Sequence, residues 1–158
     1  MSLDENFIVR SASVDDADAV TRLVMNLYGE IDHNVTEDAA RDVTRTLLAG
    51  EPSYRALLAF LPETQQAVGL LTLAQTCATY AGGRFGIIQE FYVEAEVRSR
   101  GVGSALLAHA RELATKRRWT RLEVTAPFGE RFWRSVQFYR ENGFQDSGPR
   151  LFLAIAAR

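Results

Sequence analysis

One stretch of the chain, residues 90–107, constrains the fold more than any other. It opens with residues 90–93, Glu-Phe-Tyr-Val, a β-branched and aromatic run that favours a strand. A short charged turn follows and carries two glycines, Gly101 and Gly103, one residue apart. From Val102 onward apolar residues recur every three or four positions, as on one face of a helix. The sequence therefore predicts a strand, a glycine-rich turn and a helix in direct succession.

A turn of this kind can direct several main-chain N–H groups at one point. The first turn of a helix has N–H groups without intrahelical acceptors, and the helix dipole favours an anion there. Glycine leaves room for a phosphate to approach the main chain. A plain helix entry with two flexible glycines is the alternative. The residues of the candidate pyrophosphate-binding turn are Arg98, Ser99, Arg100, Gly101, Val102, Gly103 and Ser104.

Composition excludes several other classes of protein. A chain of 158 residues suggests a single domain over residues 1–158, which can bury roughly 70% of its unfolded surface. The net charge of −2 argues against a general nucleic-acid binder. A lone cysteine, Cys77, excludes a disulfide framework and a cysteine-rich zinc site, and we expect no metal. Because no long apolar run or signal peptide is present, we expect a cytoplasmic protein without a membrane partner.

Apolar periodicity and turn residues place the other elements. Strands are predicted at residues 7–12, 54–61, 68–77, 85–93, 121–126 and 150–155. Helices are predicted from Ser13 to Gly29 and over residues 36–50, 102–118 and 131–141. The central strand, helix and strand form a βαβ unit, whose two strands run parallel. The prediction is an α/β fold with a mixed, mostly antiparallel sheet, a parallel βαβ core and about four flanking helices.

Two common phosphate-binding motifs fit the turn poorly. A P-loop would need Gly-Lys-Ser or Gly-Lys-Thr, which the chain lacks. A dinucleotide-binding fingerprint has its first two glycines here, but Leu106 occupies the third glycine position. Glu123 does lie about 20 residues after these glycines, where that fingerprint has an acidic residue that binds the ribose of the dinucleotide. However, residues 94–100 are too long for a tight turn, and the chain has one such unit where the dinucleotide fold has two.

Two motifs resemble those of the GNAT superfamily of N-acetyltransferases. Residues 98–103, Arg-Ser-Arg-Gly-Val-Gly, are similar to the family pattern Arg/Gln-x-x-Gly-x-Gly/Ala. The flanking residues 91–93 and 105–107 look like the family as well. Downstream, residues 138–144, Phe-Tyr-Arg-Glu-Asn-Gly-Phe, are similar to a second family motif. The predicted order of elements fits the family over nearly the whole chain.

The resemblance implies that acetyl-CoA, or another acyl-CoA, is the co-substrate. It implies that the main chain of Phe91, Tyr92 and Val93 pairs with the pantetheine arm, and that the amides from Arg98 to Ser104 hold the pyrophosphate. Family members often carry Asn seven residues before the helix tyrosine and a small residue four before it. Here these positions hold Phe132, which cannot supply the amide contact, and Ser135, a mild change that we keep among the cofactor-binding residues.

The resemblance also implies direct attack of an amine on the thioester, without an acyl-enzyme. Tyr139 matches the family tyrosine that hydrogen-bonds the leaving sulfur. The reference pKa of tyrosine, about 10, exceeds that of a thiol, about 8.5, so hydrogen bonding to the thiolate is easier than full proton transfer. Core packing is the alternative role for Tyr139, because Phe132 and Val136 share its helical stripe. Cys77 is not needed as a nucleophile, and we expect it to be buried in a strand.

A carboxylate near the pantetheine segment could deprotonate or anchor the amine. Glu90 is the first candidate, because it lies on the same strand with its side chain on the opposite face from Phe91. Glu123 on the next strand and Glu30 after the first helix are the second and third. A solvated strand carboxylate without catalytic function is the alternative for each.

The acceptor is expected to meet residues 28–36 and 79–84. The acidic and aromatic residues of this rim are Tyr28, Glu30, Asp32 and Tyr80. An acidic and aromatic rim suits a cationic small-molecule amine, although ordinary surface loops share this composition. We therefore predict an N-acetyltransferase acting on a small primary amine. A protein or peptide N-acetyltransferase and a non-catalytic acyl-CoA-binding regulatory domain are the alternatives. A homodimer is common in the family, and the aromatic-rich C-terminal third is the feature that could serve it.

Overall fold

The structure is a computed structural model that describes residues 7–151, 153 and 154. The chain divides into two compact units, Met1–Val124 and Thr125–Arg158. The first unit holds a five-stranded sheet and three helices, and the second holds a short fourth helix. The single domain expected over residues 1–158 stays a prediction.

The sheet is mixed, with its strands side by side in chain order. Its strands are β1 (Ile8–Ser11), β2 (Tyr54–Phe60), β3 (Ala67–Ala78), β4 (Gly83–Val93) and β5 (Leu122–Val124). The first four strands pair antiparallel, and β4 and β5 pair parallel. The parallel pair is joined by helix α3 (Val102–Lys116), so the predicted βαβ unit and the mixed α/β fold are confirmed.

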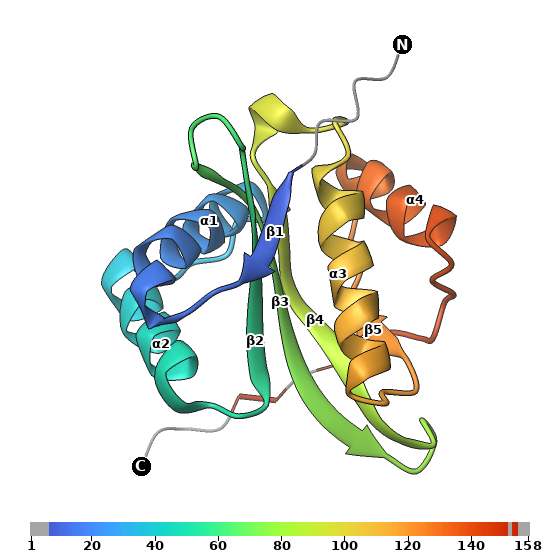
Figure 1. Cartoon of the computed structure of the whole chain (residues 1–158). Helices are drawn as coiled ribbons and strands as arrows, with labels where there is room; N and C mark the ends of the chain where they lie inside the picture. Colours follow the sequence, from blue (N-terminus) through green and yellow to red (C-terminus); the bar gives the residue numbers. More distant parts are fainter. Residues whose placement is uncertain (1–6, 152, 155–158) are drawn as a thin grey trace. The chain divides into compact units, whose positions relative to one another are not determined.

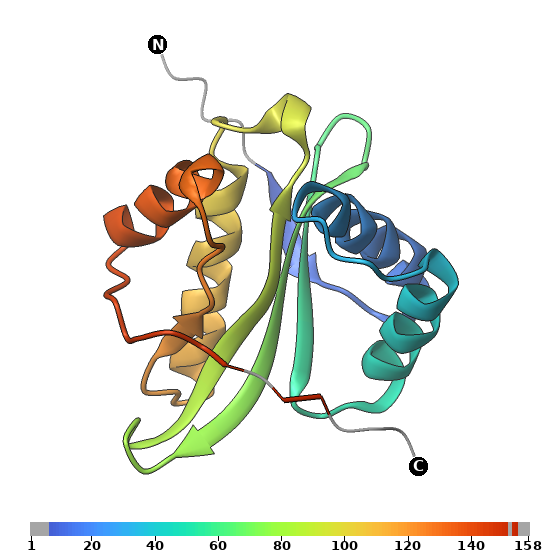
Figure 2. The ribbon, with the colours of Figure 1, turned by 180° about the vertical axis from the view of Figure 1, so that it is seen from behind.

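Helices cover both faces of the sheet in the first unit. Helices α1 (Ala17–Glu30) and α2 (Glu37–Gly50) lie on one face and α3 lies on the other (Figures 1 and 2). Helix α1 follows a short 3-10 turn, Val14–Asp16, and the Asp16 carboxylate accepts the main-chain N–H of Ser13 at 2.8 Å. Helix α2 begins after Thr36, whose hydroxyl accepts the N–H of Ala39 at 3.2 Å. Both starts use the capping chemistry of side-chain oxygens at helix N-termini.

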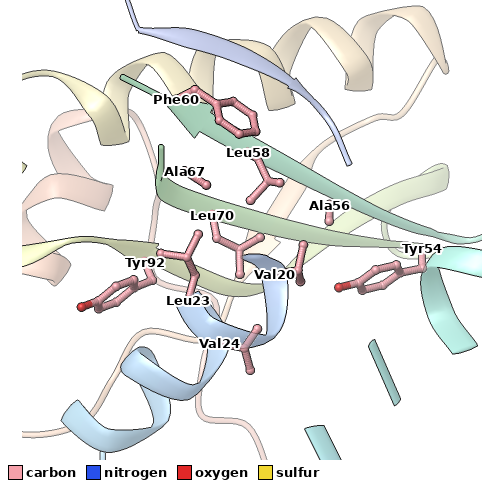
Figure 3. Close-up of a cluster of buried hydrophobic side chains, with 10 residues drawn as sticks. All are labelled: Val20, Leu23, Val24, Tyr54, Ala56, Leu58, Phe60, Ala67, Leu70 and Tyr92. Carbon is pink, nitrogen blue, oxygen red and sulfur yellow. The ribbon is translucent and has the colours of Figure 1, made fainter. Parts of the chain in front are cut away.

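The core beneath α1 joins that helix to β2, β3 and β4. Val20 and Leu23 of α1 and Leu58 and Leu70 of the sheet are fully buried. Figure 3 shows these side chains gathered between helix and strands, with two tyrosines at the borders of the cluster. Burying each of these aliphatic side chains stabilises the fold by about 2 kcal/mol. This core fixes α1 against the strands that carry the predicted site.

On the opposite face, α3 packs directly against the main chain of β3. A Cβ atom at Gly69 would lie 2.7 Å from Cγ1 of Val102 and 2.9 Å from Cδ1 of Leu106. Only glycine permits this approach, because any side chain would push the helix away. The first turn of α3, and the glycine turn before it, are thereby held against the sheet.

The predicted C-terminal strand is wrong for the residues that the structure describes. Residues 150, 151, 153 and 154 form no strand, and residues 152 and 155 lie outside the described part. Leu151 and Leu153 are 90% and 85% exposed. An apolar run favours a strand only where a neighbouring strand supplies hydrogen bonds and apolar surface.

The predicted burial of Cys77 is also wrong, because its side chain is exposed. Cys77 lies near the end of β3, in the hairpin that β3 forms with β4 (Figure 1), and not in the buried middle of the strand. Smaller differences concern helix α1, which continues through Gly29 to Glu30, and β5, which is shorter than predicted. Across the described residues, the helices are too short or too polar to cross a lipid bilayer.

A methyl group added at Gly86 should destabilise the protein. Its Cβ would lie 2.4 and 2.6 Å from the ring of Trp119, and that ring is fixed by a 2.8 Å hydrogen bond from Nε1 to Gln75. We expect Gly86→Ala to lower the free energy of unfolding by about 1–3 kcal/mol in chemical denaturation. Gly29→Ala is the matched control, since its Cβ would meet no atom within 4 Å and helix propensity favours alanine. Equal stability of the two variants would contradict this account of the packing.

Candidate active site

The glycine turn has the geometry of a helix N-terminus open to solvent. Gly101 is the N-cap of α3 with a φ of +93°, in the left-handed region that favours glycine. The first intrahelical hydrogen bond runs from the N–H of Ala105 to the Gly101 carbonyl, at 2.9 Å. The N–H groups of residues 102–104 therefore precede the helical ladder and point out along its axis. Val102 is buried against the sheet, whereas Ser104 is exposed.

The Arg98 side chain turns back from this turn toward α1. Its Nε donates to the carbonyl of Val93 at 2.9 Å, and its Nη2 donates to Glu30 at 2.6 Å. Its guanidinium also lies 5.4 Å from the ring centre of Tyr92. The Arg98 side chain thus ties the start of the turn to the end of β4 and to the last residue of α1. The Arg100 guanidinium lies over the Phe7 ring, at 6.0 Å.

Strand β4 continues past the end of β5. The parallel pairing ends at Ile88 opposite Val124, so residues 89–93 run on beside β3. The N–H of Glu90 donates to Thr72 Oγ1 and the N–H of Glu94 donates to Val68, both at 2.9 Å and both toward β3. Successive residues of a strand direct their main-chain N–H and C=O groups to opposite sides. Since Glu90 and Glu94 direct theirs toward β3, the main-chain groups of Phe91 and Val93 are directed to the β5 side.

Phe91 and Val93 are thus the two of the three predicted pantetheine-binding residues whose main-chain groups are directed to the β5 side. Tyr92 pairs with Leu70 on β3, and its side chain is buried in the core beneath α1. Its ring lies at the border of that cluster (Figure 3). Burial is the main reason that the pKa of Tyr92 rises to about 12, with the nearby Glu94 carboxylate adding to the effect.

Glu90 is held by hydroxyl groups from two other elements. The Tyr28 hydroxyl donates to Oε1 of Glu90 at 3.0 Å, and the Thr72 hydroxyl makes a short hydrogen bond to Oε2. Thr72 is fully buried and Glu90 is half-buried. Burial, followed by the nearby Glu90 charge, raises the pKa of both Tyr28 and Tyr54 well above the usual range, so both hydroxyls stay protonated. The result is a carboxylate fixed at both oxygens.

The two other candidate carboxylates are already paired with arginines. Glu123 accepts hydrogen bonds from Nε and Nη2 of Arg121, at 2.9 and 2.7 Å, and one from Tyr80 at 3.3 Å. Glu30 is paired with Arg98. Within the described residues, no ion pair to Glu90 is found, and its partners there are neutral hydroxyls. Glu90 is therefore the candidate whose charge remains available to a substrate cation.

The remaining predicted residues belong to the second unit. Tyr139 lies in α4 (Trp133–Glu141), which follows the 3-10 turn Glu130–Phe132. Its ring is buried and makes edge contacts with the rings of Phe138 and Phe144, at 5.8 and 5.4 Å between centres. Burial raises the pKa of Tyr139 to about 12, so its hydroxyl is protonated at neutral pH. Ser135 lies one helical turn earlier and is exposed.

Sequence reasoning missed Thr72 as a site residue. A single hydroxyl inside the apolar run of residues 67–73 was the available signal, because a buried polar group requires a hydrogen-bond partner. Tyr28 was placed on the acceptor rim but not linked to Glu90. Among the described residues, no three His, Cys, Asp or Glu side chains are grouped to hold a metal ion.

The comparisons with known proteins point to one family of enzymes. A model of the acetyltransferase (GNAT) domain matches residues 52–146. The chain is similar to the crystal structure of a probable acetyltransferase, with a TM-score of 0.80 and 20% identity over 96% of this chain and 99% of that one. It is also similar to an aminoglycoside acetyltransferase from an uncultured soil metagenomic sample, with a TM-score of 0.78 and 18% identity over 96% and 99% of the two chains.

A third similar structure is a ribosomal-protein-alanine N-acetyltransferase from Brucella melitensis biovar Abortus 2308. Its TM-score is 0.75 and its identity is 18%, over 96% of this chain and 100% of that one. At these identities the structural likeness speaks for the fold, while the domain model covers more than half of the chain. The motifs, the mixed sheet and the matching domain model together show that this chain belongs to the GNAT family of acetyltransferases.

Proposed function

We propose that this protein transfers an acetyl group from acetyl-CoA to a primary amine of a small molecule, by direct attack in a ternary complex. The observation that carries the proposal is the half-buried Glu90, held by hydroxyl groups and not paired with a cation in the described part. It lies on β4 just before Phe91 and Val93, whose main-chain groups are directed to the β5 side. The same strand leads into the Gly101 turn.

In this proposal acetyl-CoA lies along the end of β4 and the start of α3. Within residues 91–93, the main chain of Phe91 and Val93 pairs with the pantetheine arm, and the N–H groups of residues 98–104 bind the pyrophosphate. The left-handed Gly101 and the open N-terminus of α3 support this assignment, because both favour a bound anion. Ser135 is assigned to the cofactor as well, from the family motif alone.

The chemistry requires a neutral amine, a polarised carbonyl and a stabilised leaving thiolate. The amine nitrogen attacks the thioester carbon, a C–N bond forms, and the C–S bond breaks to release CoA as a thiolate. Glu90 takes the amine proton, directly or through water, or anchors the ammonium before it loses that proton. Tyr139 donates a hydrogen bond to the leaving sulfur. A pKa of about 12 suits this role, since the hydroxyl then stays protonated throughout the neutral range.

The acceptor class is the finer part of the proposal. Structures of similar fold include an aminoglycoside acetyltransferase and a ribosomal-protein-alanine N-acetyltransferase, both 18% identical to this chain. A carboxylate beside an aromatic ring recognises an ammonium group, and Glu90 beside Tyr28 supplies this pair. A peptide amine is the alternative acceptor, and a non-catalytic acyl-CoA-binding domain is the alternative function. The presence of Glu90 and Tyr139 argues against the non-catalytic acyl-CoA-binding domain.

Acetyl-CoA binding and thiol release together test the proposed function. At 100 times its dissociation constant, acetyl-CoA should stabilise the protein by about 2.7 kcal/mol and raise the melting temperature. Release of free thiol should then be measured with a polyamine, an aminoglycoside, a lysine peptide and a peptide with N-terminal alanine. Release with a small amine is the expected result, and release with peptides alone would favour the protein acceptor. Binding without release would support the regulatory domain, and absence of both would overturn the proposal.

Gly101→Ala should weaken acetyl-CoA binding. An alanine at a φ of +93° is strained by roughly 1–2 kcal/mol, although its Cβ would meet no atom within 4 Å. We expect a folded protein with a lower melting temperature and a several-fold higher Kd for acetyl-CoA. Gly50→Ala, in open space at the end of α2, is the control and should leave the Kd unchanged. An unchanged Kd for Gly101→Ala would argue against this turn as the pyrophosphate site.

Tyr139→Phe should lower turnover far more than it weakens cofactor binding. The variant keeps the ring that packs on Phe138 and Phe144 and removes the hydroxyl. We expect kcat to fall about 100-fold, as for loss of one hydrogen-bond donor to a developing negative charge, with a nearly unchanged Kd for acetyl-CoA. Steady-state kinetics and isothermal titration calorimetry measure the two quantities. Equal turnover in the two proteins would remove Tyr139 from the mechanism.

A further inference from the structure

Helix α1 carries three polar side chains at regular spacing. Arg22, Asn26 and Glu30 lie four residues apart, so they share one stripe along the helix. The Arg22 guanidinium makes a short ion pair with Glu94 and also donates to the carbonyl of Ala67 at 2.6 Å. Asn26 donates to the same Glu94 carboxylate at 3.3 Å. The stripe therefore holds the residue that directly follows β4.

The last residue of this stripe holds the start of the glycine turn. Glu30 accepts a hydrogen bond from Nη2 of Arg98 at 2.6 Å, while Nε of Arg98 donates to the Val93 carbonyl at 2.9 Å. The two residues bound by the stripe, Glu94 and Arg98, lie on either side of the 3-10 turn Ala95–Val97. The chain that leads from β4 into the glycine turn is thus fastened to α1 at two points.

The residue after Arg98 has an unfavourable main-chain conformation. Ser99 has a φ of +63°, in the left-handed region that residues with a side chain rarely adopt. Such a conformation persists only where the surrounding structure fixes the chain on both sides. On the helix side, Val102 packs against Gly69 of the sheet. On the strand side, the anchored Arg98 is the residue that fixes the turn.

The Arg98 side chain has two different roles open to it beside an anion site. An arginine there can bind a phosphate directly, or it can hold the turn in shape. Its guanidinium contacts Glu30, the Val93 carbonyl and the Tyr92 ring, all of which lie outside the turn. The Arg98 and Glu30 side chains are 44% and 45% exposed, so their ion pair adds little to the overall stability. These contacts favour a role in the shape of the turn.

We infer that Glu30 is a positioning residue for acetyl-CoA. Its ion pair keeps the Arg98 guanidinium on α1, and this contact holds the main-chain N–H groups of the turn in the arrangement that binds the pyrophosphate. The inference rests on the proposed function of the turn. It gives a carboxylate a favourable effect on the binding of an anion, which is the opposite of its Coulomb effect. If Arg98 bound a phosphate directly, loss of Glu30 would free the guanidinium and strengthen binding.

Two single variants and their combination separate these roles. Glu30→Gln keeps the shape of the side chain and removes its charge, and Arg98→Met keeps an unbranched chain and removes the donors. The double variant tests whether the two residues act through one another. Glu37→Gln is the matched control, because it makes the same substitution in an exposed ion pair of α2, with Arg41.

Three quantities are measured for each protein. Calorimetry gives the Kd for acetyl-CoA, and NMR titration gives the Kd for S-acetylpantetheine, which has the acetylated arm and lacks the pyrophosphate. Urea denaturation gives the free energy of unfolding. A role in the fold alone would change the last of these, whereas a role in the turn changes only the first.

A further readout needs no cofactor. In ¹⁵N-labelled protein without ligand, the amide signal of Gly101 reports the geometry of the turn. It is identified by its loss in Gly101→Ala. We expect this signal to move in Glu30→Gln and in Arg98→Met, and to stay in place in Glu37→Gln.

For Glu30→Gln we expect the Kd for acetyl-CoA to rise about threefold to fivefold, the most that an exposed ion pair supplies. Binding of S-acetylpantetheine should be unchanged, and the free energy of unfolding should match that of Glu37→Gln. Arg98→Met should raise the Kd for acetyl-CoA at least as much, and the double variant should raise it by less than the product of the two single effects.

An unchanged or lower Kd for acetyl-CoA in Glu30→Gln would overturn the inference. An equal loss of S-acetylpantetheine binding, or an unmoved Gly101 signal, would overturn it as well. Absence of acetyl-CoA binding by the wild type would instead overturn the proposed function, while the Gly101 signal would still decide whether Glu30 shapes the turn.

Discussion

The shifted pairing between β3 and β4 is the constraint on which the candidate site depends. Before the shift, Gly86 and Ile88 share the face of the sheet that packs on α3, because they pair with Gln75 and Leu73, which lie on the same face of β3 as Gly69. Regular alternation would then direct Glu90 to the same apolar face, where an unpaired carboxylate is strongly disfavoured. The extra residue at the shift reverses the alternation, so that Glu90 meets Tyr28 and Thr72 instead. The same reversal directs the main chain of the next residues to the β5 side.

The packing of α3 on Gly69 links this strand pair to the glycine turn. Val102 is both the first residue of α3 and one of the side chains that contact Gly69. The N-terminus of the helix is therefore held by the sheet and not by the turn alone. Arg98 adds a second tie, to the end of β4 and to α1. Exposed ion pairs of this kind contribute little to stability, so the close helix packing dominates the placement of the turn.

Glu90 illustrates how a site is set apart from the structural ion pairs around it. Glu30 and Glu123 are neutralised by arginines, which suits carboxylates that join elements of the fold. Glu90 is half-buried, and its partners in the described residues are hydroxyls, which orient a charge without cancelling it. The fold thereby keeps one oriented negative charge beside the strand that would bind the cofactor, and this is the arrangement expected of a group that meets a cationic amine.

Local sequence determined the element order, the βαβ unit and the glycine turn, because helix periodicity, caps and glycines act over a few residues. It also singled out Glu90 and the family motifs. It misplaced the strand at residues 150–155 and the environment of Cys77, because pairing and burial depend on neighbours distant in sequence. Only the tertiary structure brought Tyr28 and Thr72 to Glu90, from which they lie 62 and 18 positions away in the sequence. A register shift has no local signature, yet it decides which face every later side chain of the strand occupies.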